Sequence, residues 1–306
     1  MPASPGPPAG DLDRMIEYSA AFDRPHFELP GGAEVAVIVA VNVEHYEFRP
    51  PANQYKNEYL GKTRYPDVVG YGYRDYGNRV GLWRMLEVLD AFDCRVTCAL
   101  NTAVLTMFPQ ITAAMVERDW TYMFHGTYNT RYLFGARPQD ELAMYLDAID
   151  EIRRHTGKQV RGVLGPGFSS SENSPRLLRE AGMSYTMDWF VDDRPFLIDT
   201  PAGDLVGVPY SRELNDSAVM SGPPYYALGG EFFGRSCRRQ YEVLRQEPGG
   251  RVMTLAVHPF LLGLPDQIGY LHDTLDWLSR QPGIWWATPD EVADLYLSQR
   301  RTEVSG

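Results

Sequence analysis

Carboxylate and imidazole side chains follow the first strongly apolar run of this chain. "EVAVIVAV" (34–41) reads as a buried strand, and Glu44 and His45 come shortly after it. Burying such groups costs free energy unless they are paired, protonated or bound to a metal. Carboxylates and imidazoles also act as general bases, general acids and metal ligands in enzymes. This stretch is therefore either a solvated strand end or part of an active site.

The same pattern recurs along the chain. Polar groups that could do chemistry follow three further apolar runs: His125 and Asn129 after 120–124, Asp188 and Trp189 after 184–187, and His258 after 251–257. Each of these residues alone could be a hydrogen-bonded boundary residue, or a cap of the next segment. In a parallel barrel, however, the carboxyl ends of the strands meet at one end. The joint pattern therefore indicates one site assembled from four strands.

Strand-like and helix-like segments alternate over most of the sequence. Eight apolar runs suit buried strands: 34–41, 94–100, 120–125, 160–165, 184–189, 204–210, 251–258 and 284–288. Helical spacing is found in 78–92, 102–119, 137–157, 268–283 and 288–299. The alternation predicts a parallel α/β fold, either a distorted β/α barrel of seven or eight strands or a doubly wound open sheet. No phosphate-binding glycine motif follows the first strand, so nothing indicates a nucleotide site.

Two long segments rich in Tyr, Gly and Pro separate these elements. They cover residues 49–77 and 211–234, and we predict binding loops or lids there. The first ten residues, "MPASPGPPAG", are expected to form a disordered tail. Residues 11–306 are expected to form a single domain.

The composition narrows the possible partners. The 306 residues are 44% hydrophobic, which supports a large core, and the net charge of −11 argues against nucleic acid or an anionic membrane as a partner. Three cysteines without a CxxC spacing favour reduced thiols over a disulfide framework. The N-terminus lacks the basic start of a signal peptide, and no run is long enough to span a bilayer. We therefore predict a cytoplasmic protein that binds a small-molecule substrate.

The ordered motifs resemble a known family. Asn-Val-Glu-His, His-x-x-x-Asn, Gly-Pro-Gly, Asp-Trp and Leu-x-x-His occur in the order seen in the polysaccharide deacetylase superfamily (carbohydrate esterase family 4, NodB-like). "YGYRDYGNRVGLWRMLEVLDAF", "DWFVDDRP" and "HPFLLGLP" are more similar to the branch of metal-independent allantoinases and cyclic imide hydrolases. The resemblance runs from about residue 34 to 298. It implies a distorted β/α barrel and a homo-oligomer.

The resemblance also implies catalytic roles. In the family's first motif, Thr-Phe-Asp-Asp, the first Asp is the general base. Glu44 stands at that position here. Asp188 matches the Asp of the family's Asp-Trp motif. His258 matches the histidine that protonates the leaving group. The arginine that usually precedes the proline of the third motif is missing, because Leu164 and Gly165 stand there.

Metal binding is left open between two alternatives. The resemblance places His45, His125 and Asn129 at the metal-ligand positions, and the two histidines suit zinc, nickel or cobalt. Asn129 replaces a histidine and offers at best a carbonyl oxygen, whereas a catalytic zinc usually keeps three protein ligands. If Glu44 or Glu47 completed the set, Glu44 would lose its role as the base. Without a metal, His45 and His125 would polarise the substrate carbonyl directly. No organic cofactor is expected.

The predicted function is hydrolysis of a carbon–nitrogen bond other than a peptide bond, opening a small cyclic imide, cyclic amide or ureide. One alternative is an N-deacetylase of a small acetylated sugar or biosynthetic intermediate, and another is a catalytically inactive family member that binds a ligand. The acidic surface and Tyr-rich loops suit a small, neutral, partly planar substrate. The residues predicted to bind it are Tyr73, Tyr76, Gly167, Trp189 and Phe260.

Overall fold

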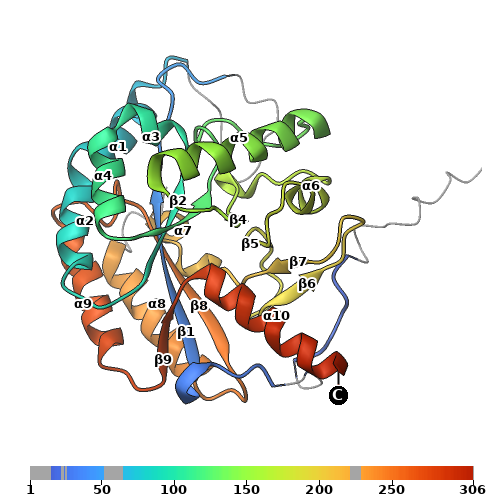
Figure 1. Cartoon of the computed structure of the whole chain (residues 1–306). Helices are drawn as coiled ribbons and strands as arrows, with labels where there is room; N and C mark the ends of the chain where they lie inside the picture. The colour runs from blue at the N-terminus through green and yellow to red at the C-terminus, as the bar shows by residue number, and fades with distance from the viewer. Residues whose placement is uncertain (1–14, 22–23, 25, 52–64, 221–228, 306) are drawn as a thin grey trace, which may run out of the picture.

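A computed structural model of the chain describes residues 15–21, 24, 26–51, 65–220 and 229–305 (Figure 1). In this part of the chain nine strands form one curled sheet in the order β6-β7-β5-β4-β3-β2-β1-β8, and β9 also pairs with β1. Every pairing is parallel except that of β6 with β7. The strands are β1 (Val35–Val43), β2 (Val96–Leu100), β3 (Thr121–Phe124), β4 (Gly162–Val163), β5 (Tyr185–Thr186), β6 (Phe196–Ile198), β7 (Leu205–Gly207), β8 (Arg251–Val257) and β9 (Ile284–Ala287). The predicted α/β class and distorted barrel are confirmed.

Each of the eight predicted strands has a counterpart, although most are shorter than predicted. The additional strand, β6, has three residues and lies at the antiparallel edge of the sheet. Its segment, "RPFLIDT", begins with a charged residue and a proline and is too short to show a periodic pattern. The sequence therefore gave no basis for predicting it.

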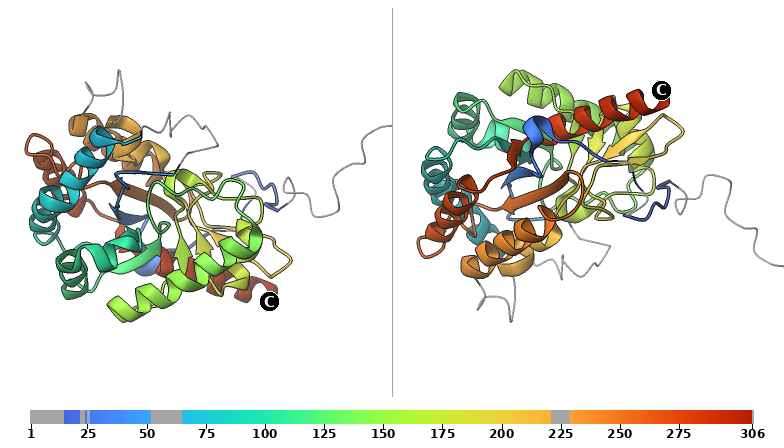
Figure 2. Two further views of the ribbon diagram at one scale, coloured as in Figure 1. Left: turned by 90° about the horizontal axis from the view of Figure 1, so that it is seen from above. Right: turned by 90° about the horizontal axis from the view of Figure 1, so that it is seen from below.

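Helices cover the outside of the sheet, as the views from above and below show (Figure 2). The α-helices are α1 (Val68–Tyr76), α2 (Leu82–Leu89), α3 (Ala103–Met107), α4 (Pro109–Glu117), α5 (Pro138–Thr156), α6 (Ser174–Glu180), α7 (Asp216–Met220), α8 (Gly229–Leu244), α9 (Ile268–Ser279) and α10 (Pro289–Ser305). A π-helical turn, η3 (Gly77–Gly81), joins α1 to α2. Three short 3₁₀ turns are η2 (Pro30–Gly32), η4 (Pro166–Phe168) and η5 (Arg212–Leu214).

One predicted helix and two predicted loops need correction. The helix predicted over 102–119 is divided into α3 and α4, because Phe108 precedes Pro109 and has a non-helical backbone (φ −131°, ψ 67°). The loop predicted over 49–77 contains α1, and the loop predicted over 211–234 contains η5, α7 and the start of α8. Their remaining parts, 52–64 and 221–228, lie outside the described residues, as does the predicted tail.

Strand β1 is the centre of the core. All nine of its residues are buried, which explains the continuous apolar run: both faces of a parallel sheet are covered. Along one edge β1 pairs with β8. Along the other it pairs first with β9, over Val35–Ile38, and then with β2, over Val39–Val43. The carboxyl ends of β1, β2, β3 and β8 consequently point the same way and bring the residues after these strands together.

An irregular segment closes the barrel beside β8. The Thr254 hydroxyl donates to the Pro209 carbonyl at 2.9 Å, and Asn215 forms an isolated parallel bridge with Ala256. The chain between β7 and α7 therefore completes the circle without forming a regular strand. Among the described residues, no helix has the length and apolar character needed to cross a membrane.

Candidate active site

Glu44 lies at the carboxyl end of β1 and is the centre of a buried charge cluster. Its Oε1 is 3.1 Å from Nε2 of His125 and 3.4 Å from Nε2 of His258. Asn78, in the π-helical turn η3, holds the Glu44 carbonyl through a 2.8 Å hydrogen bond. Oε2 of Glu44 is buried and has no hydrogen-bond partner in the described part of the chain. One oxygen of this carboxylate is thus shared by two imidazoles, and the other can accept a proton.

His125 follows β3 and is held from two sides. Its Nδ1 lies 2.5 Å from the Leu164 carbonyl, and its Nε2 faces Glu44. Because a carbonyl and a carboxylate both accept hydrogen bonds, both contacts are satisfied when both ring nitrogens donate. Asn101 fixes the backbone nearby: its side chain accepts from the His45 amide at 2.8 Å and donates to the His125 carbonyl. The ends of β1 and β3 are therefore tied together.

His258 follows β8 and is paired with a second carboxylate, Asp216. Nδ1 of His258 lies 2.5 Å from Oδ1 of Asp216, and the His258 backbone N–H donates to Oδ2 at 2.7 Å. Asp216 is fully buried at the first residue of α7. Asp216 was not predicted as a site residue, because it lies in a segment predicted to be a loop and follows no apolar run. The available signal was one acidic residue at a possible helix start, which does not distinguish a cap from a histidine partner.

These contacts set the charges of the site. Burial by itself would raise the pKa of Glu44, but the charge of His258 and the hydrogen bond from His125 outweigh it and hold the pKa far below its usual range. Burial by itself would lower the pKa of His258, but the charges of Asp216 and Glu44 raise it to about 10. At neutral pH Glu44 is therefore ionised and His258 is protonated. A general base and a general acid need these two states.

Asp188 lies after β5, in a supporting position beside His125. Its Oδ1 accepts from the Gly165 amide at 2.7 Å, and its Oδ2 accepts from the Ser170 hydroxyl. Burial raises the pKa of Asp188, while the hydrogen bonds from Ser170 and Gly165 and the charge of His125 oppose the rise. The carboxylate thus fixes the loop after β4, whose Leu164 carbonyl orients His125.

The residues at the predicted metal positions have different surroundings. The His45 ring lies among aromatic rings, with centroids 5.3 Å from Phe108 and 5.8 Å from Tyr128. Burial lowers the pKa of His45, although the charges of nearby carboxylates oppose this. The Asn129 amide donates to the Tyr46 hydroxyl at 2.5 Å, and its Oδ1 is buried without a partner in the described residues.

The predicted substrate-binding residues divide into two groups. The Phe260 ring lies 5.1 Å from the His258 ring and 5.6 Å from the Tyr73 ring, so both belong to the wall of the site. The Tyr76 hydroxyl instead accepts a 2.6 Å hydrogen bond from Arg84. Trp189 packs against the main core, and Gly167 occupies the left-handed region (φ 58°) in η4.

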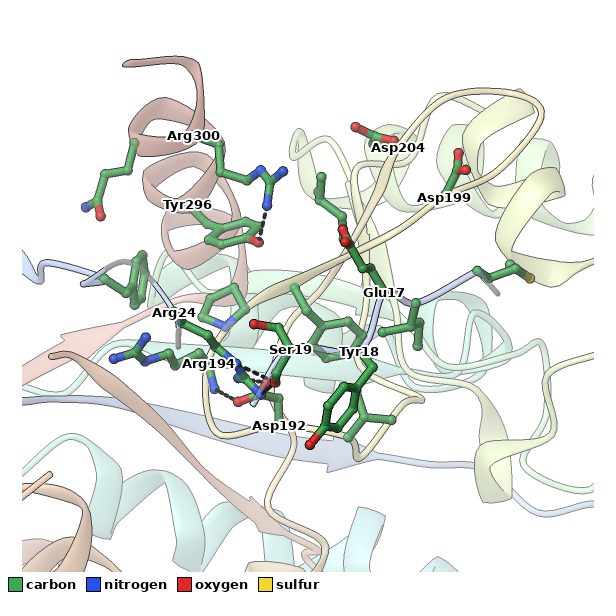
Figure 3. A pocket seen from close by; sticks show the side chains of 18 of the residues that line it. Glu17, Tyr18, Ser19, Arg24, Asp192, Arg194, Asp199, Asp204, Tyr296 and Arg300 are labelled. Atoms are coloured by element: carbon green, nitrogen blue, oxygen red, sulfur yellow. Dashed lines mark hydrogen bonds and ion pairs between the residues drawn. The ribbon is translucent and has the colours of Figure 1, made fainter. Parts of the chain in front are cut away.

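A large cavity lies apart from this cluster. It has a volume of about 710 Å³ and lies among the N-terminal segment, the loop before β6 and α10 (Figure 3). Arg24 and Asp192 form an ion pair on its wall, and Tyr296 of α10 faces it. The described residues that line this cavity include none of the predicted catalytic, metal-binding or substrate-binding residues.

The fold and the charge cluster together define a barrel-type hydrolase, with its acid and base at the carboxyl ends of the strands. Residues 71–186 match the family described as "Polysaccharide deacetylase". Over these residues, which are less than half of the chain, the chain is similar to that family, whose members are hydrolases that act on carbon–nitrogen bonds other than peptide bonds.

One relative and two solved structures are similar to this chain over most of its length. A "Putative polysaccharide deacetylase" of Schizosaccharomyces pombe is 22% identical over 245 residues, which cover 74% of this chain and 75% of the relative. The crystal structure of "Puue Allantoinase" has a TM-score of 0.79, with 21% identity and coverage of 90% and 94%. A "probable Polysaccharide deacetylase" from Pseudomonas aeruginosa PAO1 has a TM-score of 0.78, with the same identity and coverage. At these identities the structural likeness shows the fold alone.

Members of that family are commonly metal-dependent, but the donor set of this chain does not fit a catalytic metal. Among the described residues, no three His, Cys, Asp or Glu side chains are grouped so as to hold an ion. The His45 ring packs among aromatic rings, while Nε2 of His125 faces Glu44. These contacts do not fit the usual catalytic set of three protein ligands. We therefore derive no catalytic step through a metal.

Proposed function

We propose that this protein opens a small cyclic imide, cyclic amide or ureide by attack of water on a ring carbonyl. The observation that carries the proposal is the buried row of Asp216, His258, Glu44 and His125. It supplies an ionised carboxylate next to a histidine held in its protonated form. Hydrolysis of a ring C–N bond needs such a pair, because water must lose a proton and the departing nitrogen must gain one.

Each side chain has a distinct task in this proposal. Glu44 takes the proton of the attacking water on Oε2, the oxygen without a partner among the described residues. His125 stabilises the developing oxyanion with its Nε2–H, which becomes available as Glu44 is neutralised. His258 donates its Nε2 proton to the departing ring nitrogen while Asp216 holds the imidazole in place. The ring opens without losing an atom, giving one acid and one amide or amine end.

The burial of the site supports a small substrate. Glu44, His125 and His258 are 5%, 3% and 5% exposed. A polysaccharide strand needs a groove that leaves the reacting groups accessible along its length, whereas a small ring can be enclosed. The fold shared with a protein named an allantoinase supports the same substrate class. N-deacetylation is the second candidate, supported by the polysaccharide deacetylase names of the family and its relatives.

The first test is a panel of succinimide, hydantoin, allantoin and N-acetylglucosamine, assayed before and after chelation. Ring opening without acetate release is expected. Acetate release without ring opening would favour the deacetylase, and binding without turnover would favour an inactive ligand-binding protein. Loss of turnover on chelation would contradict the metal-free mechanism and would indicate that His45 and His125 are metal ligands.

The second test removes the base. Glu44→Gln should lower kcat by about 10²–10⁴-fold, the usual contribution of one acid–base group, and should leave substrate binding measurable. Glu47→Gln is the matched control, because Glu47 lies on the same segment but pairs with Arg131 and Thr130 instead. Unchanged turnover in Glu44→Gln would contradict the assigned mechanism.

A further inference from the structure

Arg74 of α1 is a cation in the active site that the proposed mechanism does not use. Its guanidinium carbon lies 4.1 Å from the centroid of the Tyr46 ring and 5.4 Å from that of Phe260. Both rings adjoin catalytic groups: Tyr46 follows Glu44 by two residues, and the Phe260 ring is 5.1 Å from that of His258. The guanidinium therefore stacks on a ring that contacts His258, and it lies within electrostatic range of Glu44.

Among the described residues, Arg74 has no carboxylate partner. Within the part of the chain that the structure describes, no Asp or Glu oxygen lies within 4.0 Å of its nitrogens. Nη1 donates to the Gly70 carbonyl of the same helix at a long 3.3 Å, and the buried Nε has no hydrogen-bond partner there. Arg79, one turn later, pairs with Asp75 at 2.5 Å. Arg74 also donates a hydrogen bond to the Tyr46 hydroxyl, but its Nε remains an unused donor among the described residues of this half-buried site.

We propose that Arg74 binds a carboxylate on the substrate, so that the preferred substrate is a cyclic imide, amide or ureide bearing an acid group. This inference rests on the proposed function. A guanidinium presents a planar fork of N–H donors that matches a carboxylate, and stacking on aromatic rings fixes the plane of that fork. The neutral substrate expected from the acidic composition is revised accordingly.

The charges of the site are consistent with this role. Glu44 is ionised and would repel an anionic substrate if no cation faced it. His258 is already engaged by two carboxylates, Asp216 and Glu44. Arg74 lies within electrostatic range of Glu44 but makes no ion pair with it. It can therefore attract an anionic group while Glu44 remains free to act as the base.

The test compares two probes that share one ring, hydantoin and hydantoin-5-acetate. Binding is measured by calorimetry in the Glu44→Gln protein, where turnover is suppressed, and kcat/KM is measured in the protein with Glu44 intact. We expect hydantoin-5-acetate to bind about 10–100-fold more tightly than hydantoin, as for a charge-assisted hydrogen-bonded pair. Arg74→Met should abolish this preference, and Arg74→Lys should retain part of it. Arg79→Met, the matched control, should retain it fully.

The outcomes separate this proposal from the proposed function. Carboxylate binding that depends on Arg74 supports the proposal even if neither ring is opened. Equal binding of the two probes, no binding of hydantoin-5-acetate, or a preference that survives Arg74→Met would overturn it even if both rings are opened. If Arg74→Met lowers kcat/KM equally for both probes, Arg74 acts through Glu44 and not on the carboxylate, which also overturns the proposal. If Arg74→Met does not fold, Arg74→Lys serves as the test. Full retention of the preference for hydantoin-5-acetate in Arg74→Lys would overturn the proposed contact between the planar guanidinium and the carboxylate.

Discussion

At the residue scale, the site is organised around the two oxygens of Glu44. Oε1 is shared between His125 and His258, and this sharing fixes the carboxylate and keeps it ionised. Oε2 is buried without a partner in the described residues, which is a costly state for a charged atom unless a ligand completes it. The arrangement therefore stabilises Glu44 through one oxygen and keeps the other for chemistry.

Asp216 should control the protonation of His258. Asp216→Asn removes the charge that raises the His258 pKa to about 10, and the amide cannot accept from both the ring and the backbone N–H. We expect the alkaline limb of the kcat/KM profile to move from near pH 10 to lower pH, with activity at pH 8 reduced by about 10²-fold or more. Profiles from pH 6 to 10.5 test this. A loss of activity with an unmoved alkaline limb would indicate a purely structural role.

The part of the site that could be predicted is the part that follows strands. Glu44, His125 and His258 each come after an apolar run, and parallel strands bring such positions together. Asp216 and Arg74 come from segments predicted as loops, and their partners are distant in sequence. The local sequence around a polar loop residue does not indicate which residues it will contact in the folded protein. Tertiary packing alone determines these contacts.

At the element scale, two glycines let a helix approach the loop that carries Phe260. A Cβ at Gly77 would lie 2.7 Å from the Phe260 amide nitrogen, and a Cβ at Gly81 would lie 2.0 Å from the Pro259 carbonyl oxygen. The two glycines are four residues apart and therefore on one helical face. The same helical segment donates from Asn78 to the Glu44 carbonyl. The segments "YGNRVG" (76–81) and "HPFLLG" (258–263) therefore pack directly against each other.

Gly81→Ala should destabilise the protein, because the added methyl group meets backbone and not a flexible side chain. We expect a loss of about 1–3 kcal/mol in the free energy of unfolding, as for other overpacked cores. Gly72→Ala is the matched control in α1: nothing lies within 4 Å of its Cβ, so helix propensity should stabilise it by up to about 1 kcal/mol. Urea denaturation measures both. Changes of the same sign would contradict the close-contact argument.

Regular elements were easier to predict than their interruptions. The apolar runs identified β1 and β8, and the helical spacing over 137–157 identified α5. This helix begins at Pro138 and is followed by Gly157, which is left-handed at φ 73°. The break at Pro109 was missed because apolar spacing continues across it. Helix α1 was missed because its sequence, "VVGYGYRDY", is rich in Gly and Tyr. Its packing against the Phe260 loop outweighs this weak propensity.

At the scale of the whole molecule, the irregular segment that closes the barrel places Asp216 beside His258, the general acid that contacts Glu44. The chain from Pro209 to Asn215 runs beside β8 and ends where α7 begins, so Asp216 reaches the residue that follows β8. A further regular strand in this place would alternate its side chains across the sheet. The irregular segment instead directs a buried carboxylate at His258. Folding of the barrel and assembly of the charge row therefore depend on each other.

This coupling should appear in the pH dependence of stability. His258 has a folded pKa of about 10 against an ordinary value of 6.5, so its contribution to stability is fully present below pH 6.5 and is lost as the pH rises toward 10. The depressed pKa of Glu44 gives the opposite dependence, with stability present above about 4.5 and lost toward acid. Between pH 6.5 and 10 the free energy of unfolding should fall more steeply in the wild type than in His258→Gln. The difference in slope should be at most about 1.4 kcal/mol per pH unit, the value for one proton. Urea denaturation at half-unit steps tests this, and parallel curves would mean that His258 does not retain its proton in the folded protein.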